Sequence, residues 1–381
     1  MSKRISVHDC QRIVIKVGSS LLVENSGINQ AWLATLASDI RTLISGGTQI
    51  LLVSSGAIAL GHRLLNLPNR PLQLDENQAA AAVGQIELGK AWSEALCSYS
   101  LVPAQILLTV NDTEGWSGRR SYLNTRNTIE RLLSLRSVPV INENDTVATS
   151  KIRYGDNDRL AARIATMISA DLLILLSDID GLYTEPPTNN PDARLIEIIN
   201  DITPEIVRMA GSAKSDLSRG GMVTKIEAAK IATRAGISMI ISSGKRRFPI
   251  RSIDEGQPAT WFLTNQSTSR TSARKIWISG QLETKGGLTV DQGAVRALEN
   301  GKSLLPTGVI DIEGSFSRGD IIAIYASNGV RIAQGLAGYD SRSAKLIMGY
   351  KSEELSQILG LGYEGRNEIV HRDNLVLTLS T

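Results

Sequence analysis

The chain has 381 residues, 42% hydrophobic and 21% charged, which is the composition of an ordinary soluble globular protein. Its 41 basic and 38 acidic residues leave a net charge of +3, too small to indicate binding to nucleic acid or a membrane surface. Two cysteines, Cys10 and Cys97, and three histidines far apart in sequence disfavour a disulfide framework, a His-rich metal site and a histidine-dependent triad. The sequence shows no apolar leader and no run of 18 apolar residues, so we expect a cytoplasmic protein without membrane association.

Strands and helices alternate along the first two thirds of the chain. Short apolar runs predict strands, and 3.6-residue periodicity predicts helices. The predicted strands are residues 12–17, 50–53, 102–109, 138–141, 172–176 and 237–242, with Trp261 and Phe262 closing the sheet, and the predicted helices are residues 29–44, 76–97, 122–135 and 226–235. This alternation predicts an α/β fold, a parallel-rich open sheet sandwiched by helices.

Two of these strands end in small residues that suit a ligand. Residues 12–17 contain Lys16 and run into Gly18, and residues 50–53 run into Ser55 and Gly56. Lys16 in an apolar strand is either an edge lysine whose ammonium group reaches solvent or a phosphate ligand beside the turn. Ser55 offers a hydroxyl, and Gly56 allows close approach of the backbone to a small ligand.

Two polar clusters follow the strand at residues 138–141. The first covers residues 142–145 and the second covers residues 155–158, where an amphipathic helix with Leu160 and Ile164 on one side begins. Asp and Asn also serve as turn and N-cap residues, which is the alternative interpretation. Two such clusters at a strand end and a helix start favour a binding site, because open α/β sheets bind ligands at this edge.

A further stretch, residues 211–225, is rich in small and basic residues and precedes the predicted helix 226–235. It is either a solvated loop or a mobile lid over an anion. No G-x-x-x-x-G-K-[ST] motif occurs in the chain, which excludes a Walker-type phosphate loop. Two lysines, helix N-termini and carboxylates remain, and these are the groups that phosphoryl transfer requires for positioning and charge neutralisation.

The last third of the chain has a different pattern. Residues 1–262 form the predicted first domain, and residues 263–275 read as a polar linker. Residues 276–381 predict a small β-rich domain with 10 basic and 12 acidic residues, a balance that gives little support for RNA binding. Its predicted elements are strands at residues 275–279, 308–312, 320–326 and 330–339 and a helix near residues 291–299.

Six motifs in order carry a resemblance to a known family. They are KVGSS at residues 16–20, SSGAI at 54–58, VINEND at 140–145, GDND at 155–158, DGLY at 180–183 and GGM-x-TK at 220–225. Together they resemble the amino acid kinase family, and within it the members that phosphorylate the side-chain carboxylate of glutamate at the start of proline biosynthesis. Residues 304–306, LLP, and 316–320, FSRGD, resemble a PUA domain, the appendage typical of bacterial members of this kind.

The resemblance implies a role for individual residues. Lys16 and Lys225 would contact the ATP phosphates, and Asp158 would hold both lysines in place, so these three are the expected catalytic residues. The implied glutamate-binding residues are Ser55, Gly56, Asn142, Asp145 and Asn157. The implied ATP-binding residues are Lys16, Gly18, Ser177, Asp178, Arg219, Gly220, Gly221, Met222, Val223, Thr224 and Lys225. One departure is Ser218-Arg219, which stands where the family usually has Gly-Thr.

The resemblance also implies partners. The expected substrates are L-glutamate and ATP, with Mg²⁺ carried by ATP and no metal site made by the protein alone. Proline is a candidate inhibitor, the chain is expected to form a homo-oligomer, and RNA is not an expected partner. Two alternatives stay open: a kinase of the same family with another acceptor, and an RNA-binding or regulatory protein that uses the PUA domain.

Overall fold

The computed structural model describes residues 6–24, 27–109, 119–147, 156–188, 190–211, 221–264, 284–360 and 367–378. The chain forms two compact units, Met1–Arg270 and Thr271–Thr381. The strand predicted at residues 275–279 and residues 265–275 of the predicted linker lie outside the described residues. Within the described residues, no helix combines the length and the apolar character needed to cross a membrane.

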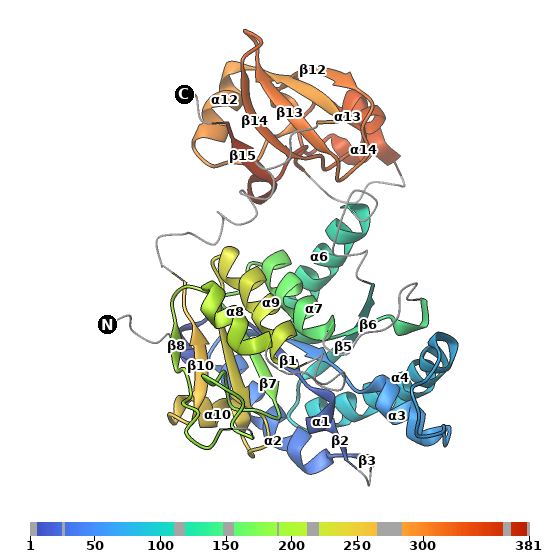
Figure 1. The fold of residues 1–381 in the computed structure, drawn as a ribbon. Helices are drawn as coiled ribbons and strands as arrows, with labels where there is room; N and C mark the ends of the chain where they lie inside the picture. The colour runs from blue at the N-terminus through green and yellow to red at the C-terminus, as the bar shows by residue number, and fades with distance from the viewer. Residues whose placement is uncertain are drawn as a thin grey trace. The chain divides into compact units, whose positions relative to one another are not determined.

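The described part of the first unit is built on an eight-stranded sheet (Figure 1). Strands β9 and β10 pair antiparallel, and the other described neighbours are parallel, so the predicted parallel-rich sheet is confirmed. Trp261 and Phe262 lie in β10, but β8 pairs outside it, so the prediction that they close the sheet is wrong. The spatial order is β5 (Val102–Leu108), β6 (Ser137–Glu143), β4 (Gln49–Ser54), β1 (Arg12–Val17), β7 (Leu172–Ser177), β9 (Ser238–Ser243), β10 (Ala259–Phe262) and β8 (Ile198–Ile199).

Helices cover both faces of this sheet (Figure 1). Alternate residues of β1 point to opposite faces. Ile13 and Ile15 therefore pack in the core that contains Trp32 of α2 and Trp92 of α4, whereas Lys16 faces the opposite layer. The first layer contains α2 (Gln30–Ser45), α4 (Leu74–Cys97) and α10 (Pro249–Asp254), and the second contains α6 (Arg119–Ser134), α7 (Asp156–Met167), α8 (Pro204–Gly211) and α9 (Met222–Arg234).

Helix α2 shows how local sequence sets the ends of an element. The Asn29 side chain accepts a hydrogen bond from the Trp32 backbone N–H at 3.0 Å, which satisfies one of the free donors of the first turn. The helix ends at Gly46, and Gly47 follows with φ of 95°, a conformation that glycine adopts without a steric penalty. The predicted helix 29–44 is confirmed to within one residue at each end.

Two short helices near the carboxyl ends of the strands were not predicted. They are α1 (Ser19–Leu22) and α3 (Ala57–Leu64), and the small residues that precede each one read as turns. Helix α3 packs on α4 with the two backbones in contact, because glycines stand at the crossing. A Cβ atom on Gly61 would lie 1.7 Å from the Ala80 carbonyl oxygen, and one on Gly84 would lie 1.8 Å from the Ala57 carbonyl oxygen. A small hairpin, β2 (Val23–Glu24) and β3 (Gly27–Ile28), follows α1.

The described part of the second unit contains a five-stranded sheet with its own apolar core, which includes Leu288, Ile324 and Val370. The predicted strands near residues 308–312, 320–326 and 330–339 and the helix near 291–299 are confirmed, whereas β11 and β15 were missed. The sheet order is β12 (Val309–Gly314), β11 (Gly286–Val290), β13 (Ile321–Ala326), β14 (Arg331–Leu336) and β15 (Leu375–Leu377), and the helices are α12 (Gln292–Glu299), α13 (Ser341–Ile347) and α14 (Leu355–Leu359).

Candidate active site

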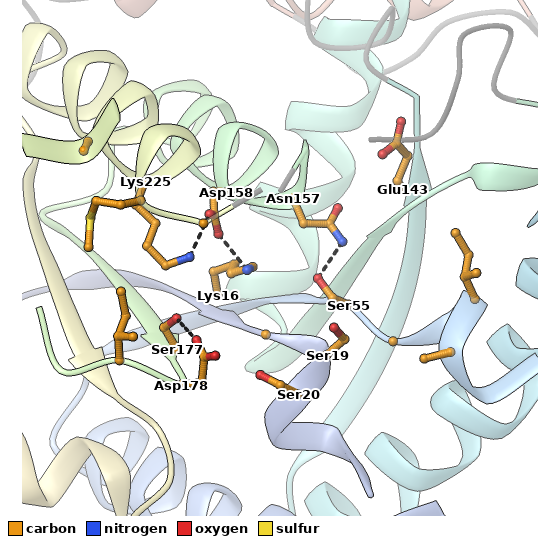
Figure 2. A pocket seen from close by; sticks show the side chains of 18 of the residues that line it. Lys16, Ser19, Ser20, Ser55, Glu143, Asn157, Asp158, Ser177, Asp178 and Lys225 are labelled. Atoms are coloured by element: carbon orange, nitrogen blue, oxygen red, sulfur yellow. Dashed lines mark hydrogen bonds and ion pairs between the residues drawn. The ribbon is translucent and has the colours of Figure 1, made fainter. Parts of the chain in front are cut away.

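A pocket of 1120 Å³ opens at the edge of the first unit where β1, β4, β6 and β7 end. Parallel strands present their carboxyl ends at the same edge, so residues far apart in sequence meet there. Thirteen of the expected catalytic, substrate-binding and ATP-binding residues line it: Lys16, Gly18, Ser55, Gly56, Asn142, Asp145, Asn157, Asp158, Ser177, Asp178, Gly221, Met222 and Lys225. Figure 2 shows many of these side chains turned toward one another.

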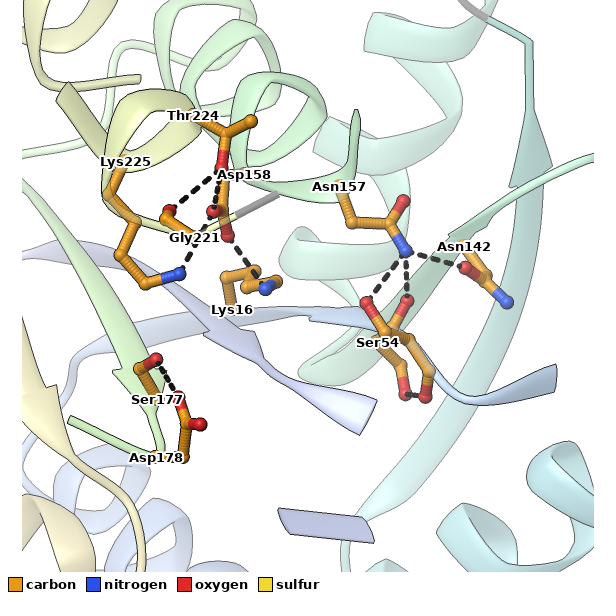
Figure 3. A network of polar contacts seen from close by, with 11 residues as sticks. Lys16, Ser54, Asn142, Asn157, Asp158, Ser177, Asp178, Gly221, Thr224 and Lys225 are labelled. Carbon is orange, nitrogen blue, oxygen red and sulfur yellow. Dashed lines mark hydrogen bonds and ion pairs between the residues drawn. The ribbon is translucent and has the colours of Figure 1, made fainter. Parts of the chain in front are cut away.

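One buried carboxylate holds two lysines at the centre of this pocket (Figures 2 and 3). The Asp158 Oδ1 atom lies 2.6 Å from Lys16 Nζ, and Asp158 Oδ2 lies 3.2 Å from Lys225 Nζ. The three residues come from β1, α7 and α9, and their exposed fractions are 7% for each lysine and 0% for Asp158. Two ammonium groups thus share one negative charge, which leaves a local excess of positive charge for an anionic ligand.

The electrostatics of Asp158 follow from these contacts. Burial by itself raises the pKa of the Asp158 carboxyl, but the charges of Lys16 and Lys225 and a hydrogen bond from Thr224 outweigh it and hold the pKa below its ordinary value. The Thr224 hydroxyl donates to Asp158 Oδ2 at 2.9 Å. Asp158 is therefore ionised at neutral pH and orients both lysines.

Helix α9 begins at Met222, four residues before the predicted start at residue 226. Gly221 is its N-cap, and Lys225 consequently lies in the first turn of the helix rather than on a loop. Thr224 is buried and faces Asp158, and Val223 is 38% exposed, so neither of these two expected ATP-binding residues lines the pocket. Arg219 and Gly220 lie outside the described residues, as does most of the predicted lid.

A second cluster, made of amides and hydroxyls, lies beside the lysines (Figure 3). The Asn157 Nδ2 atom donates to the Ser54 carbonyl oxygen at 3.1 Å, to Ser55 Oγ at 2.8 Å and to Asn142 Oδ1 at 3.2 Å. Because a backbone carbonyl can only accept, this pattern fixes which amide atom of Asn157 is the nitrogen. Asn157 Oδ1 is buried and finds no hydrogen-bond partner in the described part of the chain, which is uncommon for a buried polar atom.

The backbone at Gly56, Gly18 and Asp145 also shapes this edge of the sheet. Gly56 has φ of 113°, a left-handed conformation that favours glycine, and it is the N-cap of α3. The Gly18 N–H donates to the Leu176 carbonyl at 3.2 Å, which ties the turn after β1 to the end of β7. Asp145 begins a short 3₁₀ helix, Asp145–Val147, and is buried at the wall of the pocket.

The opposite end of the pocket lies beyond β7. The Ser177 hydroxyl donates to Asp178 Oδ1 at 3.0 Å, and the Tyr183 hydroxyl donates to Asp180 Oδ2 at 3.1 Å. Burial and the neighbouring Asp180 carboxylate raise the pKa of Tyr183. The Asp180 to Tyr183 stretch belongs to one of the six quoted motifs, although neither residue was assigned a role.

Other lining residues carried no signal in the sequence. His62 lies in α3, and Arg70 and Asn77 lie near the start of α4, whereas Ser19 and Ser20 in α1 belong to the quoted motif at residues 16–20 but were assigned no role. His62, Arg70 and Asn77 are brought to the pocket by the position of the small helix α3 against α4, which depends on tertiary packing. A single sequence without that packing gives no basis for selecting them.

Comparisons with known proteins show the family to which the chain belongs. Residues 11–243 match the amino acid kinase family, and residues 286–359 match the PUA domain. The chain is 57% identical to glutamate 5-kinase 1 of Rhizobium meliloti (strain 1021) over 98% of this chain and 94% of that protein. It is 58% identical to glutamate 5-kinase of Rhodopseudomonas palustris (strain TIE-1) over 97% of each. A solved structure, carbamate kinase from Giardia lamblia bound to AMP-PNP, matches 68% of this chain and all of that one at 17% identity with a TM-score of 0.48. The chain therefore belongs to the amino acid kinase family, in the group of the glutamate 5-kinases.

Proposed function

We propose that the chain transfers the γ-phosphoryl group of MgATP to the side-chain carboxylate of L-glutamate and forms γ-glutamyl phosphate, the first step of proline biosynthesis. The observation that carries the proposal is the pairing of two binding environments in one pocket. The Lys16, Asp158 and Lys225 group suits phosphates, and the adjacent Asn157 and Ser55 group suits a small polar acceptor. The relatives named glutamate 5-kinase support the choice of acceptor.

The lysines address the main obstacle of this reaction. The side-chain carboxylate of glutamate, with an ordinary pKa near 4.3, is already ionised at neutral pH, so no general base has to remove a proton. The difficulty is that one anion must approach another. Lys16 and Lys225 offset this repulsion and the charge that develops on the oxygen between the β and γ phosphates, while Gly221 at the start of α9 adds a helix N-terminus.

The nucleotide binds, in this proposal, across Lys16, Gly18, Ser177, Asp178 and the start of α9. Mg²⁺ enters as its complex with ATP, because this ion is usually held by substrate phosphates, water and one or two carboxylates. Asp178 is an exposed carboxylate at the phosphate end of the pocket and suits that role, whereas both oxygens of Asp158 already face lysines. The metal supplies further neutralisation of the phosphate charge.

The acceptor binds, in this proposal, against Ser55, Gly56, Asn142, Asp145 and Asn157. Asp145 and Asn157, which both line the pocket, would bind the ammonium group of glutamate. That contact fixes which carboxylate of the substrate faces ATP. A kinase of the same family that uses an acylated acceptor would have no ammonium group to place here.

Trapping of the product tests the function directly. An acyl phosphate reacts with hydroxylamine to give a stable hydroxamate, so purified protein, MgATP and hydroxylamine are incubated with L-glutamate, N-acetylglutamate, L-aspartate or UMP. We expect ATP-dependent hydroxamate with L-glutamate at a far higher rate than with the other carboxylates. Hydroxamate formation with N-acetylglutamate or aspartate in place of glutamate, or ADP release with UMP alone, would assign a different acceptor.

Three further properties belong to the same proposal. We infer that proline, which resembles a cyclised glutamate, competes at Ser55 and Asp145, and initial rates at low glutamate with millimolar proline test this. We also infer that the chain forms a homo-oligomer, and sedimentation velocity measures its assembly state. The requirement for ATP supports a cytoplasmic location. RNA binding is not favoured, since the matched relatives are kinases.

A further inference from the structure

Gln85, a residue outside the pocket, is connected to the acceptor end by a chain of three amides. Gln85 Oε1 accepts a hydrogen bond from Asn142 Nδ2 at 2.7 Å, and Asn142 Oδ1 in turn accepts from Asn157 Nδ2 at 3.2 Å. Asn142 and Asn157 line the pocket, whereas Gln85 is half-buried on α4 behind them. These hydrogen bonds therefore connect the middle of α4, a helix of 24 residues, to the wall of the pocket where the acceptor is proposed to bind.

Backbone groups identify which atom of the Asn142 and Asn157 amides is the oxygen and which is the nitrogen. The Glu143 N–H donates to Asn142 Oδ1 at 2.9 Å, so that atom must be the oxygen and Asn142 Nδ2 must face Gln85. The Ser54 carbonyl accepts from Asn157 Nδ2, so the oxygen of Asn157 must face the other way. Both constraints agree, and they leave Asn157 Oδ1 buried and without a hydrogen-bond partner in the described part of the chain.

Gln85 contributes to this arrangement through its side-chain oxygen, which accepts the hydrogen bond from Asn142 Nδ2. Without an acceptor at Gln85, the Asn142 Nδ2 group loses its hydrogen bond of 2.7 Å, and two hydrogen bonds to Asn142 Oδ1 remain, one from the Glu143 N–H and one from Asn157 Nδ2. If the Asn142 amide rotated, its nitrogen would face the nitrogen of Asn157. Both nitrogens are donors, so the hydrogen bond between these two residues would be lost. Asn157 would then turn away from its present orientation.

The position of Gln85 on α4 strengthens this role. The preceding residue, Gly84, is in backbone contact with Ala57 at the start of α3, so a Cβ at that position would lie 1.8 Å from the Ala57 carbonyl oxygen. Gly84 thus allows the close packing of α3, the helix that follows Gly56, and the adjacent Gln85 holds the amide of Asn142. Both contacts come from the same helix, α4.

We propose that Gln85 is a positioning residue that fixes the amide direction of Asn142 and Asn157 and thereby makes the acceptor end selective for an ammonium-bearing amino acid. The inference rests on the proposed glutamate kinase function and names what selects its acceptor. It requires no contact between Gln85 and the substrate.

The test compares variants that keep or remove the acceptor atom. Gln85→Leu removes it, and Gln85→Glu retains a carboxylate oxygen that Asn142 Nδ2 can donate to. We expect Gln85→Leu to raise the KM for glutamate about ten-fold, with kcat within about two-fold and the KM for ATP unchanged, as the loss of one positioned hydrogen bond predicts. Gln85→Glu should stay within about three-fold of the native chain, and the preference for glutamate over N-acetylglutamate in kcat/KM should narrow in Gln85→Leu alone.

Controls separate this inference from the proposed function and from a general effect on the helix. Glu87→Leu places the same apolar side chain at an exposed position of α4 and should change neither KM. Gln85→Met, which keeps the length but has no oxygen, replaces Gln85→Leu if that variant fails to fold. No hydroxamate from the native chain would refute the proposed function. If the native chain is active, two results would overturn the role of Gln85 alone. One is a glutamate KM in Gln85→Leu equal to that of the native chain. The other is an increase in glutamate KM that is as large in Gln85→Glu as in Gln85→Leu, together with an equal increase in the KM for ATP.

Discussion

Replacement of Asp158 by asparagine tests the central charge arrangement, because it removes one charge and changes almost no volume. Asp158 is fully buried, and each of its oxygens faces a different lysine, at 2.6 Å for Lys16 and 3.2 Å for Lys225. In Asp158→Asn the amide oxygen can still accept from one ammonium group. The amide nitrogen would then point at the other ammonium group, and neither lysine would keep a counter-charge.

The magnitude follows from burial. Removing one partner of a buried ion pair costs about 3 to 5 kcal/mol, because a charge is left uncompensated. We therefore expect Asp158→Asn to lower the free energy of unfolding of the first unit by about 3 to 5 kcal/mol at pH 7.

Urea unfolding followed by tryptophan fluorescence measures this loss, since Trp32, Trp92 and Trp261 are buried in the first unit. Asp178→Asn is the matched control: it removes a carboxylate from the same pocket, but Asp178 is exposed, and a change below about 0.5 kcal/mol is expected. Saturating MgATP should recover part of the loss in Asp158→Asn, because the triphosphate supplies negative charge to both lysines. A loss below about 1 kcal/mol at pH 7 would refute the reasoning.

The same variant has a pH signature. The pKa of Asp158 is lowered in the folded chain from an ordinary 3.8, so its contribution to stability is complete above that value. In the window below 3.8, down to the lowered folded pKa, the unfolded chain binds the extra proton and stability falls as pH falls. Asp158→Asn should lack this part of the acid limb, so the difference between the two proteins should shrink as the pH drops.

Four other outcomes are expected. Lys225→Ala should lower kcat by about 10² to 10³ with little change in the KM for glutamate, and an unchanged kcat would remove Lys225 from the site. Thr224→Val, which removes the hydroxyl on Asp158, should lower kcat about ten-fold while Thr224→Ser stays within about three-fold, and equal rates for the two variants would contradict that role. N-acetylglutamate should be a poorer acceptor by about 2 to 5 kcal/mol in kcat/KM, because it cannot pair with Asp145, and efficient turnover would show that Asp145 does not bind an ammonium group. A chain that ends at Gln266 should fold and form hydroxamate, since the buried Leu263 is retained; a folded but inactive product would show that the second unit completes the site.

The parts of the site that the sequence predicted are those with a local signature. Lys16 in an apolar strand violates the usual hydrophobic pattern, and the two Asp and Asn clusters follow a strand and open a helix. Parallel strands bring such ends to one edge, so Lys16 and Asp158 could be expected to meet. The six motifs then placed Ser55, Asn157 and Lys225 in the same pocket by resemblance.

The parts that could not be predicted depend on tertiary packing. Gln85 lies among the alanines of α4 and has no unusual neighbour in sequence, and its hydrogen bond joins residues 57 positions apart. The start of α9 was misplaced because the glycines before it read as loop, whereas Gly221 serves as an N-cap. The edge strand β8 has two residues, too few for a periodic pattern to form.

The glycine contact between α3 and α4 bears on how this enzyme can vary. Gly61 and Gly84 have no room for even a methyl group, because the obstacle is the backbone of the opposite helix. In a library of all single substitutions, these two positions should tolerate almost nothing, although neither lines the pocket. The exposed neighbours Ala82 and Glu87 should accept most residues. Sequence divergence of this chain is thus restricted at Gly61 and Gly84, where no side chain fits, whereas the exposed positions around them can accept substitutions.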